Sequence, residues 1–265
     1  MKMQLPIFQV DAFTTERFKG NPAAVVPLEQ WLGDEQMQAI AAENNLSETA
    51  FFVREPDGAF HIRWFSPLTE IDFCGHATLA SAFVIFEQRI AEAPLTFRAA
   101  AVGDIEVTLR DDGLLGMSFP NRAPEQIAEP PQALLEALDI APEAVLRNPQ
   151  AWFVVYASEQ QVRAAAPDLE ALKALAPLDV VVTAPGDRQD FASRYFWPAN
   201  GGDEDPVTGS IHAGLAPYWA ARLGKSSLVA LQASKRTGLL YCRVEGDRVF
   251  VAGAAVKYLQ GQIEL

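Results

Sequence analysis

Three side chains in this sequence are suited to acid–base chemistry: Glu48, His76 and Asp205. Glu48 lies at a predicted helix-to-strand joint, just before the apolar residues 50–53. Burial raises the pKa of a carboxyl group, and a carboxyl group that titrates near neutrality can both remove and return a proton. We therefore identify Glu48 as a candidate acid–base residue, with a surface glutamate at a turn as the alternative interpretation.

His76 and Ser210 each follow a glycine in the first turn of a predicted helix. Gly75 precedes His76, and Gly209 precedes Ser210. The first N–H groups of a helix have no partner within the helix, and the helix dipole is positive there, so a helix start can bind an anion. Two such starts facing one cleft would hold a carboxylate-bearing molecule, whereas two ordinary helix caps would need no ligand.

Asp205 belongs to an acidic segment that precedes the second of these glycines. Pro206 follows it and disfavours a helical conformation at Asp205, which keeps the carboxylate close to the helix start. At that position it would orient His76 or contact a substrate. Capping of the helix is the alternative interpretation.

Cys74 is a candidate nucleophile, because a helix start lowers the pKa of a thiol. The base nearest to it in the sequence is His76, two residues further along. Side chains two residues apart do not face each other on a helix. We therefore expect no nucleophile–base pair between Cys74 and His76.

The two helices that must position these residues carry no charge. Neither residues 76–86 nor residues 210–221 contain Asp, Glu, Lys or Arg. A helix that is apolar on all sides is buried on all sides. Because strand-like segments surround each helix in the sequence, we expect each to lie inside a strongly curved or barrel-like sheet.

The sequence also repeats itself. RWFSP at 63–67 corresponds to RYFWP at 194–198, and each is followed by an acidic loop, a glycine and a small-residue helix. An internal duplication explains this repeat. A polar segment with several prolines at 120–131 separates the copies, which predicts halves at 1–121 and 122–265.

Composition restricts the class of partner. The chain has 265 residues and a formal net charge of −13, which argues against nucleic acid because phosphate binding needs clustered Lys and Arg. With two cysteines and three histidines, neither a disulfide scaffold nor a metal site is expected. The N-terminus has no signal-peptide pattern and no apolar segment is long enough to span a membrane, so we expect a cytoplasmic protein without a membrane partner.

Four motifs connect these residues: GNPAAV at 20–25, SETAF at 47–51, FCGHAT at 73–78 and EDPVTGS at 204–210. Their order and spacing, with RYF at 194–196 before the last motif, resemble the phenazine-biosynthesis PhzF-like family of isomerases. The resemblance covers the whole chain.

The resemblance implies an α+β protein with the diaminopimelate-epimerase-like fold. That fold has two homologous, pseudo-symmetric halves, each a barrel-like, mostly antiparallel sheet wrapped around a central apolar helix. The repeat and the charge-free helices agree with this fold independently. The resemblance also implies a homodimer, no cofactor, and a C-terminal strand that often returns to the first half.

The resemblance further implies roles for the site residues. The carboxylate that matches Glu48 transfers the proton. The residues that match His76 and Asp205 line the cleft, bind the substrate and polarise it. The backbone at Gly75, Gly209 and Ser210 matches the anion-binding helix starts.

Cys74 stands where the related two-cysteine epimerases and racemases carry one catalytic thiol. Their second thiol would fall at Pro206 or Thr208, and neither is a cysteine. A two-thiol racemase is therefore disfavoured, and Cys74 is not expected to be an essential nucleophile.

The predicted function is a cofactor-independent isomerase that moves a proton within a small carboxylate-bearing metabolite in a cleft between the two halves. Glu48 is the predicted acid–base group. The alternatives are an epimerase or racemase of the same fold and a binding protein that has lost the chemistry.

Overall fold

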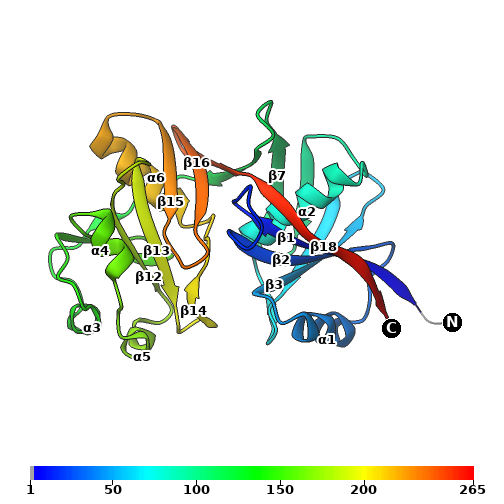
Figure 1. Ribbon diagram of the computed structural model, residues 1–265, viewed down its shortest axis with the longest axis horizontal. Coiled ribbons are helices and arrows are strands. Elements are labelled where there is room, and N and C mark those ends of the chain that lie inside the picture. The colour runs from blue at the N-terminus through cyan, green and yellow to red at the C-terminus, as the bar shows by residue number, and fades with distance from the viewer. Residues whose placement is uncertain (1–2) are drawn as a thin grey trace. The chain divides into compact units, whose positions relative to one another are not determined.

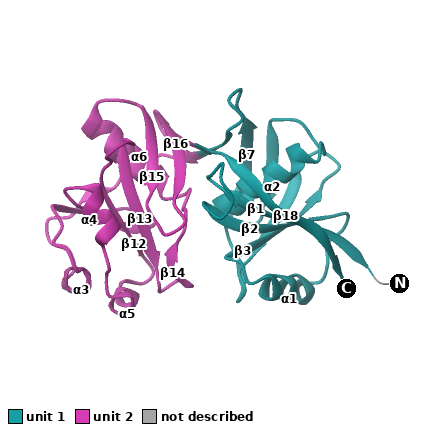
Figure 2. Cartoon of the chain, viewed as in Figure 1, with its two compact units in different colours: residues 1–118, 252–265 teal, residues 119–251 magenta. Residues whose placement is uncertain are grey.

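The computed structural model describes residues 3–265, which form two compact units (Figures 1 and 2). The first unit ends at Ser118 and also contains Ala252–Leu265, and the second comprises Phe119–Val251. Across the described residues, no helix has the length and apolar character needed to cross a membrane.

The first unit is built on one mixed sheet. β1 (Gln4–Ala12) pairs antiparallel with both β18 (Ala255–Glu264) and β2 (Asn21–Leu28). β2 pairs parallel with β3 (Glu48–Arg54), which pairs antiparallel with β4 (Phe60–Phe65). Next along the chain come β5 (Glu70–Ile71), β6 (Leu95–Ala99), β7 (Gly103–Leu109) and β8 (Leu115–Pro120), with β5 and β6 both paired to β4.

One face of this sheet is covered by α1 (Asp34–Asn44). Met37 and Ile40 of α1 belong to an apolar cluster with Val26 of β2 and Phe51 of β3. Side chains alternate between the faces of a strand, so the neighbours of Val26 and Phe51 in their strands point away from α1.

The other face receives α2 (Gly75–Glu87), which contacts β1, β2 and β3. Most α2 residues are buried, including Thr78 and Ser81. Their hydroxyl groups donate to backbone carbonyl groups one turn earlier, so no polar group of these side chains is left unpaired. The expectation that this charge-free helix is buried within a sheet is confirmed.

The second unit repeats this strand order. β11 (Ala151–Val155) pairs parallel with β12 (Asp179–Pro185), which pairs antiparallel with β13 (Phe191–Trp197). β13 pairs with β14 (Gly202–Asp205) and with β15 (Ser227–Gln232), as β4 pairs with β5 and β6. The other elements of this unit are β9 (Glu125–Gln126), β10 (Ala144–Arg147), β16 (Gly238–Glu245), α3 (Gln132–Ala137), α4 (Glu159–Ala164), α5 (Leu169–Leu172) and the short 3₁₀ helix Lys173–Leu175; β17 (Arg248–Gly253) leads into the C-terminal segment.

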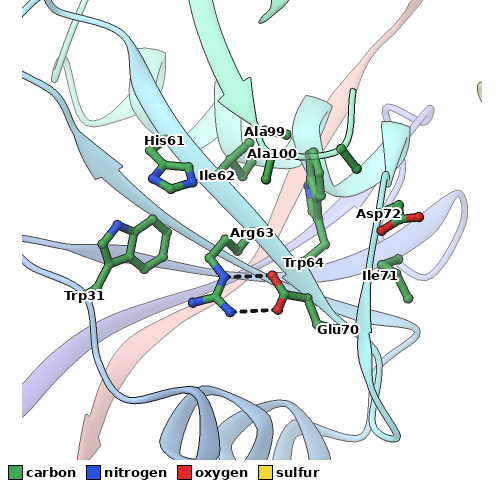
Figure 3. A pocket seen from close by; sticks show the side chains of 11 residues that line it. Trp31, His61, Ile62, Arg63, Trp64, Glu70, Ile71, Asp72, Ala99 and Ala100 are labelled. Atoms are coloured by element: carbon green, nitrogen blue, oxygen red, sulfur yellow. Dashed lines mark hydrogen bonds and ion pairs between the residues drawn. The ribbon is translucent and has the colours of Figure 1, made fainter. Parts of the chain in front are cut away.

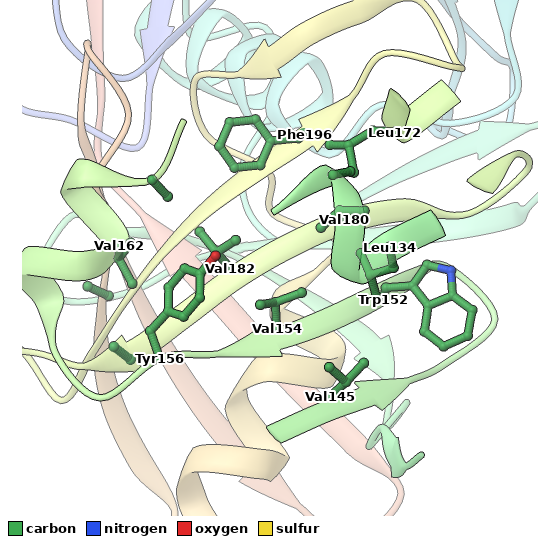
Figure 4. Packing of buried hydrophobic residues seen from close by; sticks show 14 of the residues in the cluster. Leu134, Val145, Trp152, Val154, Tyr156, Val162, Leu172, Val180, Val182 and Phe196 are labelled. Carbon is green, nitrogen blue, oxygen red and sulfur yellow. The ribbon is translucent and has the colours of Figure 1, made fainter. Parts of the chain in front are cut away.

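Helices cover both faces of this sheet too. α6 (His212–Leu223) contacts β15 and β16, and its Trp219 stacks on Phe191 and donates to the hydroxyl of Thr183. An apolar cluster packs α3, α4 and α5 against every second residue of β12, including Val180 and Val182 (Figure 4). These residues alternate along the strand with Thr183, which contacts α6. α6 and this cluster therefore lie on opposite faces.

A repeated ion pair confirms the internal duplication. Arg63 in β4 donates from Nε and Nη2 to both carboxylate oxygens of Glu70, and each distance is 2.7 Å. Arg194 in β13 donates to both oxygens of Glu204 at 2.7 and 2.9 Å. Each guanidinium also lies over the ring two residues ahead, which is a phenylalanine in both copies. The same contacts recur at matching positions in each unit.

The structure divides the chain differently from the predicted halves 1–121 and 122–265. The first division falls after Ser118, and Ala252–Leu265 returns to the first unit. The reason is that β18 covers the edge of β1 along most of its length. The family resemblance implies a C-terminal strand that returns to the first half, and β18 is such a strand.

The close packing of α6 makes Gly214 a sensitive position. A Cβ atom there would lie 2.6 Å from Cζ of Phe153 and 3.1 Å from the carbonyl oxygen of Arg122. We predict that Gly214→Ala lowers the free energy of unfolding by about 1–3 kcal/mol, as overpacked cores do. Urea unfolding measures the change. Gly261→Ala is the control: a Cβ there meets no atom within 4 Å, and a shift below about 0.5 kcal/mol is expected.

Candidate active site

Glu48 is the first residue of β3, and the parallel pairing of β3 with β2 sets its direction. It lies opposite Ala23 in that pair. Phe51 faces α1, so Glu48, three positions earlier, points to the opposite face, toward α2. Only 5% of Glu48 is exposed. The carboxylate is thus held away from solvent on the face that receives the buried helix.

His76 meets this carboxylate. It is the second residue of α2 and is also 5% exposed. Its Nε2 lies 3.1 Å from Oε2 of Glu48. Among residues 3–265, Oε2 has no aligned hydrogen-bond partner, so the contact is an ion pair by distance without hydrogen-bond geometry. The structure places two of the predicted site residues within reach of direct proton exchange.

Asn21 holds the other side of the imidazole ring. It is fully buried at the start of β2, and its Nδ2 lies 3.1 Å from Nδ1 of His76. The hydroxyl of Ser47 makes a long contact of 3.5 Å with Oδ1 of Asn21. The ring of His76 therefore has a polar neighbour at each nitrogen. Sequence reasoning assigned Asn21 no role, although its place in the GNPAAV motif was the signal that pointed to it.

Cys74 and His76 are in contact, so the helical spacing from which we expected no nucleophile–base pair between them does not describe their geometry. Sγ of Cys74 lies 3.3 Å from Nδ1 of His76. Cys74 is the N-cap of α2, with extended backbone angles of φ −140° and ψ 107°, so helical spacing does not apply to it. Its carbonyl oxygen accepts from both the N–H and the hydroxyl of Thr78, which fixes the cap.

The charges of this cluster are coupled. Burial and the nearby Glu48 carboxylate raise the pKa of Cys74 to about 11, so the thiol is protonated at neutral pH. Burial disfavours a charged His76, but its acidic neighbours Cys74 and Glu48 outweigh burial and hold the pKa of His76 well above its usual value. Because the thiol is neutral near pH 7, Glu48 is the neighbour that raises the pKa of His76 there.

The same three side chains are the described residues that can approach one cation. Glu48, Cys74 and His76 offer an oxygen, a sulfur and a nitrogen atom that all lie within 4.8 Å of one another. Zn²⁺ accepts a mixed donor set of this kind. Composition predicted no metal site, and it is the fold that brings these donors together.

Asp205 is the last residue of β14, where it pairs with Tyr195 of β13. Its Oδ2 accepts from the hydroxyl of Thr208 over 2.5 Å. The side chain of Gln232 donates to the backbone oxygen of Asp205 over 2.9 Å and accepts from the N–H of Thr208 over 2.8 Å. The half-buried carboxylate is thus tied to the segment that leads into α6.

Gly209 and Ser210 lie one turn before α6, which begins at His212 and not at Ser210 as predicted. Their carbonyl oxygens accept from the N–H groups of His212 and Ala213, so the helix is entered through a tight turn. Nε2 of Gln150 donates to the hydroxyl oxygen of Ser210 over 2.9 Å. The side chain of Ser210 is therefore held in place by a residue that sequence reasoning missed.

The predicted residues fall into two groups. Glu48 and His76 meet in the first unit, and Gly75 is the residue before His76. Asp205, Gly209 and Ser210 lie close together along the chain in the second unit. Each unit thus presents polar side chains at the start of its own buried helix.

A pocket of about 370 Å³ in the first unit does not include these residues (Figure 3). Trp31, His61 and Arg63 line it, together with Glu70. Arg63 is already paired with Glu70, as the dashed lines in Figure 3 show, and also with Asp34. Because its arginine is neutralised, this pocket is poorly suited to a carboxylate.

Comparison with known proteins identifies the family of this chain. Residues 10–261 match the family described as phenazine biosynthesis-like protein. The chain belongs to this family. It is 50% identical to a Pseudomonas aeruginosa protein named "Uncharacterized isomerase PA2770", covering 99% of this chain and 100% of that relative.

Solved structures extend the likeness to the fold. A PhzF-family protein from Enterococcus faecalis superposes with a TM-score of 0.94 at 44% identity, covering 99% of this chain and 100% of that one. A hydroxyproline epimerase from Agrobacterium vitis, at 11% identity, has a TM-score of 0.63 over 99% of this chain and 93% of its own, which shows the fold alone. This phenazine biosynthesis-like chain is an isomerase with the diaminopimelate-epimerase-like α+β fold.

We predict that Cys74→Ser keeps the fold and most of the turnover, within about tenfold of wild type. The thiol is protonated at neutral pH, and serine keeps a hydroxyl group near His76. Proton exchange into small carboxylates, followed by NMR in deuterated water, measures the activity. Cys242→Ser, at a buried cysteine of β16, is the matched control. Complete loss of turnover in a folded Cys74→Ser protein would instead support a thiol mechanism.

We also predict how pH acts on the ion pair. The folded-state pKa of His76 is raised above 6.5, so its stabilising contribution is complete below pH 6.5 and is lost as the pH rises through the raised value. The difference in unfolding free energy between wild type and His76→Gln should shrink over that range. Imidazole NMR should show His76 protonated at pH 7 and His212, with a pKa lowered by burial to about 4, neutral. A neutral His76 at pH 7 would contradict the assignment.

Proposed function

We propose that this protein is an isomerase that moves a proton between two carbons of a small carboxylate-bearing metabolite, with Glu48 as the group that carries the proton. The observation that supports this most is the buried contact of 3.1 Å between Glu48 and His76 at the starts of β3 and α2. Burying two ionisable side chains costs free energy even when they are paired. This pair is therefore better explained by a role in the reaction than by a contribution to stability.

The proposed reaction has two proton transfers. The Glu48 carboxylate removes a proton from one carbon, and the electron pair of that C–H bond is delocalised toward an electron-withdrawing group of the substrate. The resulting carboxyl group returns the proton to a second carbon on the same face. The substrate neither gains nor loses a proton, and Glu48 ends as it began.

The neighbours of Glu48 have positioning and binding roles in this proposal. His76, held between Glu48 and Asn21, lies beside the carboxylate and contacts the substrate. Hydrogen-bond donors placed where negative charge develops stabilise the transition state. The family resemblance assigns substrate binding to Asp205 and to the helix start at Gly209 and Ser210.

An epimerase or racemase that uses Glu48 and one other group is the alternative within this fold, and a two-thiol enzyme is disfavoured. In the repeat, Gly75 corresponds to Gly209, so the residue that corresponds to Cys74 is Thr208. The hydroxyl of Thr208 donates to Asp205 and is not a second thiol. The side chains present therefore favour a single carboxylate over a pair of cysteines.

We predict that Glu48→Gln retains the fold and the binding of substrate but lowers turnover by about 10²-fold or more, the scale of general acid–base catalysis. Glutamine keeps the size of the side chain and removes the base. The assay incubates candidate carboxylates in deuterated water and follows the position of incorporated deuterium by NMR. An isomerase transfers hydrogen to a new carbon, whereas an epimerase exchanges it at one carbon.

Glu43→Gln is the matched control, since Glu43 is an exposed residue near the end of α1. It should turn over as wild type does. If a folded Glu48→Gln protein exchanges and turns over at the wild-type rate, the carboxylate mechanism is wrong even though the family and fold stand.

A further inference from the structure

The repeat places a second carboxylate at the position of Glu48. Asp179 is the first residue of β12 and lies opposite Ala151 of β11, just as Glu48 begins β3 opposite Ala23 of β2. Side-chain alternation puts Asp179 on the same face as Thr183, the face that α6 covers. The second unit therefore also has a carboxylate at the strand start beside its buried helix.

Ser210 takes the place of His76, because each follows the glycine of its helix start. In the second unit the carboxylate of Asp179 is connected to Ser210 by hydrogen bonds through two intermediate side chains, Tyr195 and Gln150. The hydroxyl of Tyr195 donates to Oδ2 of Asp179 over 2.5 Å. Nε2 of Gln150 lies 3.2 Å from the hydroxyl oxygen of Tyr195 and 2.9 Å from that of Ser210.

The donor and the acceptor of each hydrogen bond in this series, from Asp179 to Ser210, can be assigned. Tyr195 is 4% exposed, and burial together with the Asp179 carboxylate raises its pKa well above the usual value, so its hydroxyl stays protonated. Its one proton goes to Asp179, whose other oxygen accepts from Nδ2 of Asn200 over 2.7 Å. The oxygen of Tyr195 can then only accept, so the amide nitrogen of Gln150 must face it.

The same logic extends to Ser210. An amide nitrogen has two protons, and Nε2 of Gln150 uses one toward Tyr195 and the other toward Ser210. The hydroxyl oxygen of Ser210 is therefore an acceptor from Gln150. Its own proton is left to donate elsewhere, and an anion at the helix start is the acceptor that the backbone there also favours.

We propose that Gln150, oriented by Tyr195 and Asp179, is a positioning residue that directs the hydroxyl proton of Ser210 toward the carboxylate of the substrate. This inference rests on the proposed function, which takes the helix start at Gly209 and Ser210 as the anion-binding part of the site. It adds that the second unit uses the Glu48-like and His76-like positions to orient a donor, whereas the first unit uses them to move a proton.

The backbone around Gln150 supports this role. The side-chain oxygen of Asn148 accepts from the N–H groups of both Gln150 and Ala151, at 2.8 and 3.0 Å. The amide nitrogen of Asn148 in turn donates to the carbonyl oxygen of Arg122 over 3.0 Å. Gln150 is thus fixed by a hydrogen-bonded turn, and its side chain needs little further ordering to hold Ser210.

The test measures binding of benzoate, a simple carboxylate probe, by isothermal titration, with benzamide as the uncharged probe. A hydrogen bond to a charged group is worth about tenfold or more in affinity. We expect Ser210→Ala to weaken benzoate about tenfold and Gln150→Leu to weaken it by roughly three- to tenfold. Benzamide binding should change less in both variants, a difference that a merely structural defect would not produce.

The double variant separates positioning from general damage. If Gln150 acts through Ser210, Gln150→Leu should add no further loss in the Ser210→Ala background, whereas independent effects would add. Tyr195→Phe should weaken benzoate binding in the same direction. Tyr156→Phe is its matched control, since that buried hydroxyl has no hydrogen-bond partner among the described residues and lies outside this chain of contacts.

The outcomes distinguish two kinds of failure. If benzoate does not bind wild type, or Ser210→Ala binds it normally, the anion site of the proposed function is wrong and this inference falls with it. If Ser210→Ala weakens benzoate but Gln150→Leu does not, or if the two losses add, the positioning role alone is overturned. Thermal unfolding of each variant must match wild type for either conclusion.

Discussion

The burial of two helices that carry a charge only in their last turn is the constraint on which the rest of this structure depends. α2 has no polar face to expose, so β1, β2 and β3 must pack around it, and α6 imposes the same condition on the sheet of the second unit. A helix enclosed in this way has its N-terminus inside the sheet and beside the start of a strand. Backbone N–H groups and a strand-start side chain therefore meet in a place with little water, which is the setting that acid–base chemistry needs.

Duplication of this arrangement has allowed the two copies to diverge in chemistry. Both retain the arginine–glutamate pair, the parallel strands and the glycine at the helix start. In the first unit the strand-start carboxylate touches a histidine directly. In the second a shorter aspartate and a serine occupy the corresponding positions, and Tyr195 and Gln150 bridge the distance between them. Direct contact suits proton transfer, whereas a relay of donors suits the orientation of a single hydroxyl group.

The electrostatic state of the first cluster follows from its burial. A carboxylate, an imidazole and a thiol share one poorly solvated place, so the charge on each depends on the other two. Burial and Glu48 keep Cys74 protonated, and Glu48 favours a charged His76. The sulfur is thus neutral near pH 7, and the imidazole lies 3.1 Å from the carboxyl group of Glu48. This arrangement fits a mechanism in which the carboxyl group of Glu48 transfers the proton. The thiol of Cys74 contacts the imidazole, but because it is protonated it is a poor nucleophile.

The sequence by itself determined the two charge-free segments, the repeat, and Glu48, His76 and Asp205 as the candidates, because charge patterns and motifs can be read along the chain without knowing which residues meet. The fold class followed from the family that these motifs resemble. Only the tertiary structure decided which side chains touch. The contact of Cys74 with His76 depends on the extended cap at Cys74, and the return of β18 depends on the open edge of β1. Asn21 and Gln150 lie far along the chain from His76 and Ser210, and hydrogen bonds between such distant residues form only after the strands and helices have packed.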